Sequence, residues 1–351
     1  MAYTDIDRPD LYFNTKLYTG NGSTQSITGV GFQPDWVWLK ARSSAYSHQL
    51  FDVVRGATKL LSSEETSAEQ TLSGVTSFDS DGFAVGSDAG SNNNTTTFAS
   101  WNWLAGNGTA SNSNGSITST VSANTTAGFS IVSYTGNGTD NATVGHGLSV
   151  TPSFALVKNR DDSDHWGVWH QSFSAHTSYN SLSQNIATIN SDDIFKAFSS
   201  TLFTLGTDSW SNTNTEKYVA YLFAEKKGFS KFGSYTGNGN ADGTFIFTGF
   251  KPAFVIFKKT SATGNWGLLD STRSYANVAN HTLAANLSDA ESSFGGGESV
   301  FGASNKVDIV SNGIKIREAS DYNNASGATY IYLAFAESPI VSSNGVPAVA
   351  R

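Results

Sequence analysis

The chain has 351 residues, a length that allows two or three domains with hydrophobic cores of their own. Only 14% of the residues are charged and the net charge is −8, which argues against a nucleic-acid-binding groove built on clustered Lys and Arg. The sequence contains no cysteine, so disulfides, cysteine nucleophiles and cysteine-ligated metal sites are excluded.

Residues 1–16 are polar and include Pro9, and they are interpreted as an N-terminal arm that docks onto another subunit, with a frayed terminus as the alternative. The pentapeptide Tyr-Thr-Gly-Asn-Gly follows, and it occurs three times, starting at Tyr18, Tyr134 and Tyr235. Asn-Gly indicates a tight turn because both residues tolerate positive φ. The recurrence predicts that the chain is built of internal repeats.

A proline marks the next predicted element of each repeat, and from it the three sequences align without a gap: PDWVWLKARSSAYSHQLFD, PSFALVKNRDDSDHWGVWH and PAFVIFKKTSATGNWGLLD. Each segment predicts a strand, a turn and a second strand. The first strand is a continuous apolar run, which indicates a strand buried on both faces or one that carries a wide aromatic surface. A lysine lies six residues after each proline, and the positions eighteen residues after it are Asp52, His170 and Asp270.

These marks divide the chain into an arm (1–16), a first repeat (17–105), a linker rich in Gly, Asn, Ser and Thr (106–115), a second repeat (116–226), a third repeat (227–338) and a tail (339–351). Each repeat has several short strands bounded by turn residues. This pattern predicts an all-β protein with three tandem antiparallel β-sandwich repeats of jelly-roll or lectin-like type, each with its aromatic residues buried between two sheets.

Motifs that carry chemistry are missing from the sequence. It has no nucleophile elbow, no phosphate-binding loop and no His-Glu pair. The carboxylates Glu225 and Glu337 end predicted strands in different repeats and are interpreted as structural rather than as a glycosidase pair. Two acidic loops, at 79–81 and 161–164, have oxygen ligands for Ca²⁺ but not the spacing of a calcium loop, so turns are predicted. The sequence thus predicts no enzyme, no metal and no cofactor.

Most tryptophans lie at repeat-equivalent positions, which favours a role in the core. Trp210 differs because it lies in the polar turn 208–212, and Tyr46 and Tyr179 lie in segments that vary among the repeats. These three residues are the candidates for a recognition surface.

No apolar run approaches the roughly 18 residues of a membrane span. The first ten residues lack the basic and apolar segments of a secretory signal. These features predict synthesis in a cytosol without membrane insertion, whereas the low-charge surface rich in Ser, Thr, Asn and Gly is typical of exported proteins. A virus particle, made in a cell and released by lysis, reconciles the two.

The sequence resembles a group of virion proteins of marine bacteriophages. The resemblance rests on AYTDIDRPDLYFNTKLYTGNGS, GFQPDWVWLKARS, LFDVVRGATK, SFDSDGFAVG and WNWLAGNGTAS, and on SITSTVSANTTAGFSIVSYTGNG and TVGHGL in the second repeat. It covers the third repeat more loosely, where Ile314-Lys-Ile-Arg replaces a Phe-x-x-Gly strand. The resemblance implies a virion component and no catalytic residue.

The expected function is therefore a bacteriophage structural protein, a tail-fibre or fibre-like component that projects β-sandwich modules for host-surface recognition. The alternatives are a capsid decoration protein and a carbohydrate-binding or polysaccharide-degrading virion protein. The expected partners are other virion subunits and a host-surface glycan or receptor, without nucleic acid. By analogy with phage fibres, a homo-oligomer, a trimer, is expected, made in the host cytoplasm and located in the virion.

Overall fold

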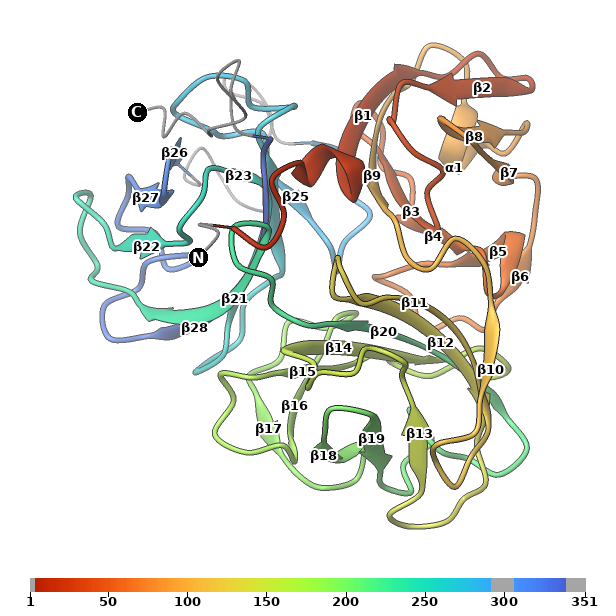
Figure 1. Ribbon diagram of the computed structural model, residues 1–351. Helices are drawn as coiled ribbons and strands as arrows, with labels where there is room; N and C mark the ends of the chain where they lie inside the picture. The colour runs from red at the N-terminus through yellow and green to blue at the C-terminus, as the bar shows by residue number, and fades with distance from the viewer. Residues whose placement is uncertain (1–3, 292–305, 339–351) are drawn as a thin grey trace.

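The structure is a computed structural model that describes residues 4–291 and 306–338. Within these ranges the chain forms six sheets, and all pairs of named strands are antiparallel (Figure 1). The helices are two short turns, η1 (Pro9–Leu11) and α1 (Ala89–Asn92). The prediction of an all-β fold made of antiparallel sheets is confirmed. No helix within the described ranges is long and apolar enough to cross a membrane.

The sheets pair in chain order into three modules, each with one main sheet and one small sheet of three strands. Module 1 has main-sheet order β1-β9-β3-β4-β5-β6 and small-sheet order β2-β8-β7. Its strands are β1 (Phe13–Thr19), β2 (Gln25–Thr28), β3 (Trp36–Ala41), β4 (Gln49–Asp52), β5 (Gly56–Leu61), β6 (Gln70–Thr71), β7 (Val75–Asp79), β8 (Gly82–Val85) and β9 (Thr97–Trp103).

Module 2 has main-sheet order β10-β11-β12-β20-β14-β15-β16-β17 and small-sheet order β13-β19-β18. Its strands are β10 (Ala110–Asn112), β11 (Ser119–Asn124), β12 (Phe129–Thr135), β13 (Thr143–Gly145), β14 (Phe154–Asn159), β15 (Gly167–His170), β16 (Ser178–Ser181), β17 (Ile189–Asn190), β18 (Phe195–Phe198), β19 (Leu202–Leu205) and β20 (Lys217–Phe223).

Module 3 has main-sheet order β21-β28-β23-β24-β25 and small-sheet order β22-β27-β26. Its strands are β21 (Ser230–Thr236), β22 (Phe245–Phe247), β23 (Pro252–Lys259), β24 (Gly267–Asp270), β25 (Leu283–Ala284), β26 (Val307–Val310), β27 (Gly313–Ile316) and β28 (Thr329–Ala336).

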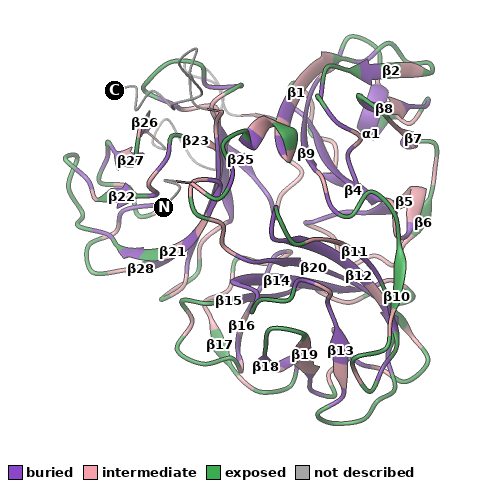
Figure 2. Cartoon of the chain, viewed as in Figure 1, coloured by how far each residue is buried: buried purple, intermediate pink, exposed green. Residues whose placement is uncertain are grey.

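The strands β3, β14 and β23 in the main sheets are buried on both faces (Figure 2). In β3, Val37 and Leu39 pack inside module 1, whereas Trp36 and Trp38 point the other way, into a cluster shared with the other modules. Alternate side chains of a strand lie on opposite faces, so the run supplies two cores at once. The strands β14 and β23 divide their residues in the same manner.

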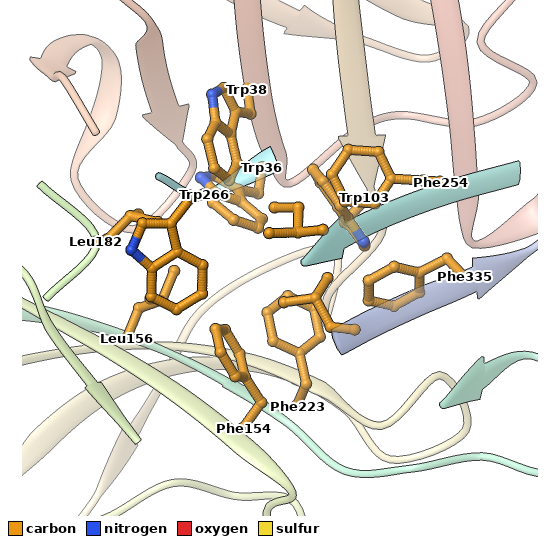
Figure 3. A pocket seen from close by; sticks show the side chains of 12 residues that line it. Trp36, Trp38, Trp103, Phe154, Leu156, Leu182, Phe223, Phe254, Trp266 and Phe335 are labelled. Atoms are coloured by element: carbon orange, nitrogen blue, oxygen red, sulfur yellow. The ribbon is translucent and has the colours of Figure 1, made fainter. Parts of the chain in front are cut away.

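The shared cluster is a central core, formed where the main sheets of the three modules meet (Figures 1 and 3). Four aromatic rings contact one another there. The ring centroid of Phe13 lies 4.9 to 5.6 Å from the centroids of Trp103, Phe254 and Phe335. A cavity of about 20 Å³, room for about one water molecule, lies in this core and is lined in part by Trp103, Phe254 and Phe335. The tryptophans expected between the two sheets of each repeat lie mostly in this central core, namely Trp36, Trp38, Trp101, Trp103, Trp166 and Trp266.

Two segments expected to lie outside the repeats are part of the packed structure. In the arm, Ile6 is buried in the central core and the Asp5 backbone N–H donates to Lys227 O of the same chain (2.9 Å). Strand β1 already begins at Phe13. The segment 106–115, expected to be a linker, contains β10, which pairs with β11 at the edge of module 2. The tail 339–351 lies outside the described residues.

The repeated pentapeptide fastens the ends of β1, β12 and β21 to a buried asparagine in each module, namely Asn92, Asn212 and Asn324. In module 2, Asn212 Oδ1 accepts from Asn137 N (3.0 Å), and its amide donates to Gly206 O (2.9 Å). Glycine is needed at position 136 because a Cβ there would lie 2.3 Å from Thr213 O. The motif is therefore a structural clamp that recurs because each module closes in the same way.

Replacing Asn212 with alanine should lower the free energy of unfolding by about 2 kcal/mol, because buried backbone groups would lose their partners. Chemical denaturation of the variant and of the wild type measures the difference. Asn214→Ala is the matched control, since Asn214 is exposed two residues further along the chain. Equal stability of the two variants would contradict the clamp.

Candidate functional site

The junctions between the modules hold a repeated set of buried polar contacts. Fourteen residues after each repeat proline, a ring nitrogen contacts a backbone oxygen of a neighbouring module. Trp166 Nε1 donates to Ser62 O (2.8 Å), and Trp266 Nε1 donates to Ser181 O (2.7 Å). The third contact joins His48 Nε2 and Ala284 O (2.9 Å). The three bonds therefore form a closed cycle, from module 2 to 1, from 3 to 2 and from 1 to 3.

The tautomer of His48 follows from its neighbours. Indole is only a donor, so Trp38 Nε1, at 2.8 Å, must donate to His48 Nδ1. The proton of the imidazole then lies on Nε2 and is donated to Ala284 O. Burial lowers the pKa of His48 well below its usual value, which keeps the ring neutral. This histidine is thus equivalent to the two tryptophans in position and in hydrogen bonding.

The position eighteen residues after the proline forms a second cycle. Asp52 Oδ2 accepts from Tyr221 OH of module 2 (2.7 Å), and Asp270 Oδ2 accepts from Trp101 Nε1 of module 1 (3.0 Å). In module 2, His170 Nε2 lies 3.1 Å from Tyr332 O of module 3. His170 thus also binds a group of a neighbouring module.

An ionic network continues from Asp52 across the junction of modules 1 and 2. Asp52 and Arg55 pair with fully buried side chains, and Arg55 Nη1 lies 3.2 Å from Glu69 Oε2. Glu69 in turn binds Arg160 of module 2 through both of its oxygens, at 2.9 Å each. Two guanidinium groups thus neutralise two carboxylates, which a buried network requires.

The junction of modules 3 and 1 repeats this network. Asp270 pairs with Arg273, whose Nη1 lies 3.0 Å from Glu291 Oε2. Both oxygens of Glu291 also bind Arg42 of module 1, at 2.8 and 2.9 Å. Arg55 and Arg273 both follow their aspartates by three residues, a repeated spacing that could have identified these two aspartate–arginine pairs from the sequence.

The junction of modules 2 and 3 keeps the backbone geometry without the charges. The backbone bond from Thr188 N to Thr260 O (2.9 Å) corresponds to those from Glu69 N to Arg160 O and from Glu291 N to Arg42 O. The four charged positions are occupied here by neutral residues: His170, Phe173, Thr188 and Thr260. Burial lowers the pKa of His170 to about 4, so it is neutral at physiological pH. The four-residue ionic network is therefore present at two junctions, and neutral residues replace it at the third.

Acid should weaken the junction of modules 3 and 1. Burial acts to raise the pKa of Glu291, but Arg42 and Arg273 outweigh it and lower the pKa to about 2. A carboxylate with a depressed folded-state pKa stabilises the fold above its unfolded pKa and loses this contribution as the pH falls toward the folded value. Glu291 should thus account for a loss of about 2 kcal/mol in unfolding free energy between about pH 7 and about pH 3.

Denaturation series at several pH values measure this slope. The control is Glu291→Gln, which should show a smaller loss of stability over the same pH range because position 291 no longer titrates. The assignment would be contradicted if the variant and the wild type lost stability in parallel.

The structure brings together two of the three candidate recognition residues. Trp210 and Tyr179 meet edge to face at 5.7 Å, and His165 lies 5.0 Å from Trp210. We call these three half-buried residues the aromatic cluster of module 2. Trp210 and Tyr179 also pack against the module core, so the cluster is both an edge of that core and a partly exposed surface. Tyr46 is half-buried in module 1, in the turn between β3 and β4, and does not join the cluster.

Acidic side chains surround the aromatic cluster. Asp208 Oδ1 accepts from the Trp210 backbone (2.8 Å), and burial raises the pKa of Asp208. Burial, together with Asp208 and Asp193, raises the pKa of Tyr179, so its phenol stays protonated. The indole of Trp210 and the phenol of Tyr179 can stack on a sugar ring. The phenol, the imidazole of His165 and the neighbouring carboxylates can form hydrogen bonds with the sugar hydroxyls.

The acidic loops and strand-end carboxylates have local structural partners. Asp81 accepts from the backbone of Gly29 (3.0 Å) and Gly31 (2.7 Å), and Asp161 accepts from Lys217 N (2.9 Å). Glu225 pairs with Lys231 at 2.6 Å, and Glu337 with Lys251 at 2.9 Å. The described residues contain no group of three or more His, Asp or Glu side chains arranged to hold a metal ion.

The repeated lysines are buried and support turns. Lys40, Lys158 and Lys258 each donate to the carbonyl of the following residue, at 2.9, 2.7 and 2.6 Å. Burial lowers their pKa values, to about 8 for Lys40 and Lys158 and to about 7 for Lys258. Their equivalence in the three modules indicates a common structural role.

Comparison with protein families gives one match, a domain of unknown function (DUF7483), over residues 8–339. The chain belongs to this family. The match runs from the N-terminal arm to the end of module 3, so the family is defined by the three modules together. No curated protein and no solved structure matches the chain.

Proposed function

We propose that this chain is a structural component of a bacteriophage particle and not an enzyme, in which the three modules form one rigid body that contacts a host-surface glycan. The observation that carries this proposal is the use of the buried polar groups. Asp52, Asp270, His48 and His170 all bind across module junctions, so the groups an enzyme would use for catalysis hold this protein together.

The shared central core supports the same proposal. A body in which three sheets bury one common cluster keeps its loops at fixed relative positions, as an adhesive or fibre-like protein requires. The aromatic cluster of module 2 is the recognition surface we propose, because it combines partly exposed rings with neighbouring carboxylates. The sequence resemblance to virion proteins of marine phages supports the proposed location in a phage particle.

Immunogold electron microscopy of intact phage with antibody to the purified protein tests the location. We expect gold at the tail or on fibres. Gold spread over the capsid would instead indicate a decoration protein, and protein found only in the lysate would overturn the virion assignment.

Retention on immobilised host polysaccharide tests the recognition surface. Trp210→Ala should weaken retention about tenfold through the lost stacking area. Tyr46→Ala is the matched control, because Tyr46 is also half-buried but lies in module 1. Equal retention of both variants would exclude the aromatic cluster as the contact surface.

A further inference from the structure

The tetrapeptide Gly-Asn-Gly-Thr occurs twice in the chain, at 106–109 and at 136–139. The second copy belongs to the pentapeptide clamp of module 2, and the first lies where the chain leaves module 1 for β10. Asn107 and Asn137 are both exposed, and each precedes a glycine. The two asparagines therefore have the same adjacent residues in the sequence, and they differ in their surroundings in the fold.

Asn137 is held by hydrogen bonds on both sides. Gly138 N donates to Asn212 O (3.0 Å), and Asn137 N donates to Asn212 Oδ1 (3.0 Å). Asn137 Oδ1 also accepts from Thr139 N (2.9 Å). The side-chain amide of Asn137 and the backbone nitrogen that follows it are thus both engaged.

Asn107 lacks these restraints. Its backbone N–H donates to Asp35 Oδ2 (2.9 Å), but its side-chain amide and Gly108 N make no hydrogen bond within residues 4–291 and 306–338. A Cβ placed on Gly108 would meet no atom within 4 Å, so no neighbouring group blocks rotation of this peptide. Asn107 also has a φ of 51°, in the left-handed region that side-chain-bearing residues seldom adopt.

The other Asn-Gly pairs in the described part of the chain are restrained. In modules 1 and 3, the corresponding glycine nitrogens donate to the backbone oxygens of the clamp asparagines, at 2.8 Å each. Gly313 pairs with Val310 in the hairpin of β26 and β27. Gly115 packs closely against Thr143, where a Cβ would lie 2.3 Å from Thr143 O. The pair at 344–345 lies outside the described residues.

We propose that Asn107 is a site of spontaneous deamidation, which the fold permits here and restrains at the other described Asn-Gly pairs. Gly108 N attacks Asn107 Cγ, the bond from Cγ to Nδ2 breaks, and ammonia leaves with the proton that Gly108 N gives up. Water then opens the cyclic imide to aspartate or isoaspartate. Asparagine is thermolabile, and glycine adds no side chain that hinders the attack.

The product carries a new carboxylate beside Asp35. Asp35 is fully buried, and its Oδ1 has no hydrogen-bond partner within the described residues. A second carboxylate beside a buried one is unfavourable, so the modification should weaken the contact from Asn107 N to Asp35. This contact fixes the start of the segment 106–115, and the inference does not depend on a role in a virion.

The test incubates the full, folded chain in mildly alkaline buffer and follows each asparagine by peptide mapping with mass spectrometry. Labelling by an isoaspartyl methyltransferase identifies the isoaspartate product. Asn107 should convert at least about tenfold faster than Asn137, because Asn137 reacts only after its hydrogen bonds open. In urea above the unfolding transition, the two sites should convert at similar rates, since their adjacent residues are identical.

Two variants complete the test. Asn107→Gln should abolish conversion at position 107, because the longer side chain cyclises far more slowly. Asn212→Ala should speed conversion at Asn137, because it removes the side-chain acceptor of Asn137 N. The proposal is overturned if Asn107 in the folded chain converts no faster than Asn137, or if another described Asn-Gly pair converts faster. An unchanged rate at Asn137 in Asn212→Ala would show that the clamp does not protect it.

Discussion

Replacing Trp36 with alanine should lower the free energy of unfolding by about 4 kcal/mol. Trp36 is 2% exposed and lies within 6.0 Å, centroid to centroid, of five other rings. Three of these rings, those of Phe129, Tyr221 and Phe223, belong to module 2, so the substitution opens a cavity between modules. Urea denaturation followed by tryptophan fluorescence and by circular dichroism measures the loss.

Trp36→Phe is the control for this experiment. The indole Nε1 of Trp36 is buried without a hydrogen-bond partner, so phenylalanine removes an unpaired donor and keeps most of the ring packing. It should therefore cost far less than alanine. Because the central core is shared, the two probes should also give one coincident transition. Separate transitions for the modules would contradict a common core.

Replacing Arg273 with phenylalanine should cost about 3 to 5 kcal/mol. The side chains of Arg273 and Asp270 are fully buried, and Glu291 is nearly so. Removing the guanidinium leaves Asp270 without its ion-pair partner and Glu291 with only Arg42 as an arginine partner. Thermal and urea unfolding at neutral pH measure the loss.

The junction of modules 2 and 3, where neutral residues replace this ionic network, supplies a matched control for Arg273→Phe. The fourfold variant D270H, R273F, E291T and R42T transfers the residues His170, Phe173, Thr188 and Thr260 to the equivalent positions. It should be more stable than Arg273→Phe alone, because it removes the unpaired charges together with their partner. A fourfold variant less stable than the single one would show that the two junctions are not equivalent.

Much of the local structure could be predicted from the sequence. The run Trp36 to Leu39 and its counterparts are strands buried on both faces, as their continuous apolar character indicates. The repeated pentapeptide marks equivalent turns. Each turn needs glycine where two backbone segments approach closely, and an asparagine side chain that accepts from a backbone N–H of the turn. The strand β10 at residues 110–112 could not be predicted, because a polar edge strand has the same composition as a linker.

The candidate sites depended on longer-range packing. In the sequence, Trp210 is notable for its polar turn and Tyr179 for a segment that varies among the repeats. Only the fold brings their two rings together. Arg42 and Glu291 are 249 residues apart in the chain, and neither position suggests the other.

The sequence by itself determined that this protein is all-β, that its strands recur, and which residues are buried, because alternation and turn chemistry act over a few neighbouring residues. Only the tertiary structure decided what each buried face packs against. Alternation requires Trp36 and Val37 to face opposite ways, but it does not distinguish a second sheet of the same module from the sheets of two others. Hydrophobic burial is non-directional, so the choice of partner comes from the shape and hydrogen bonding of the assembled modules.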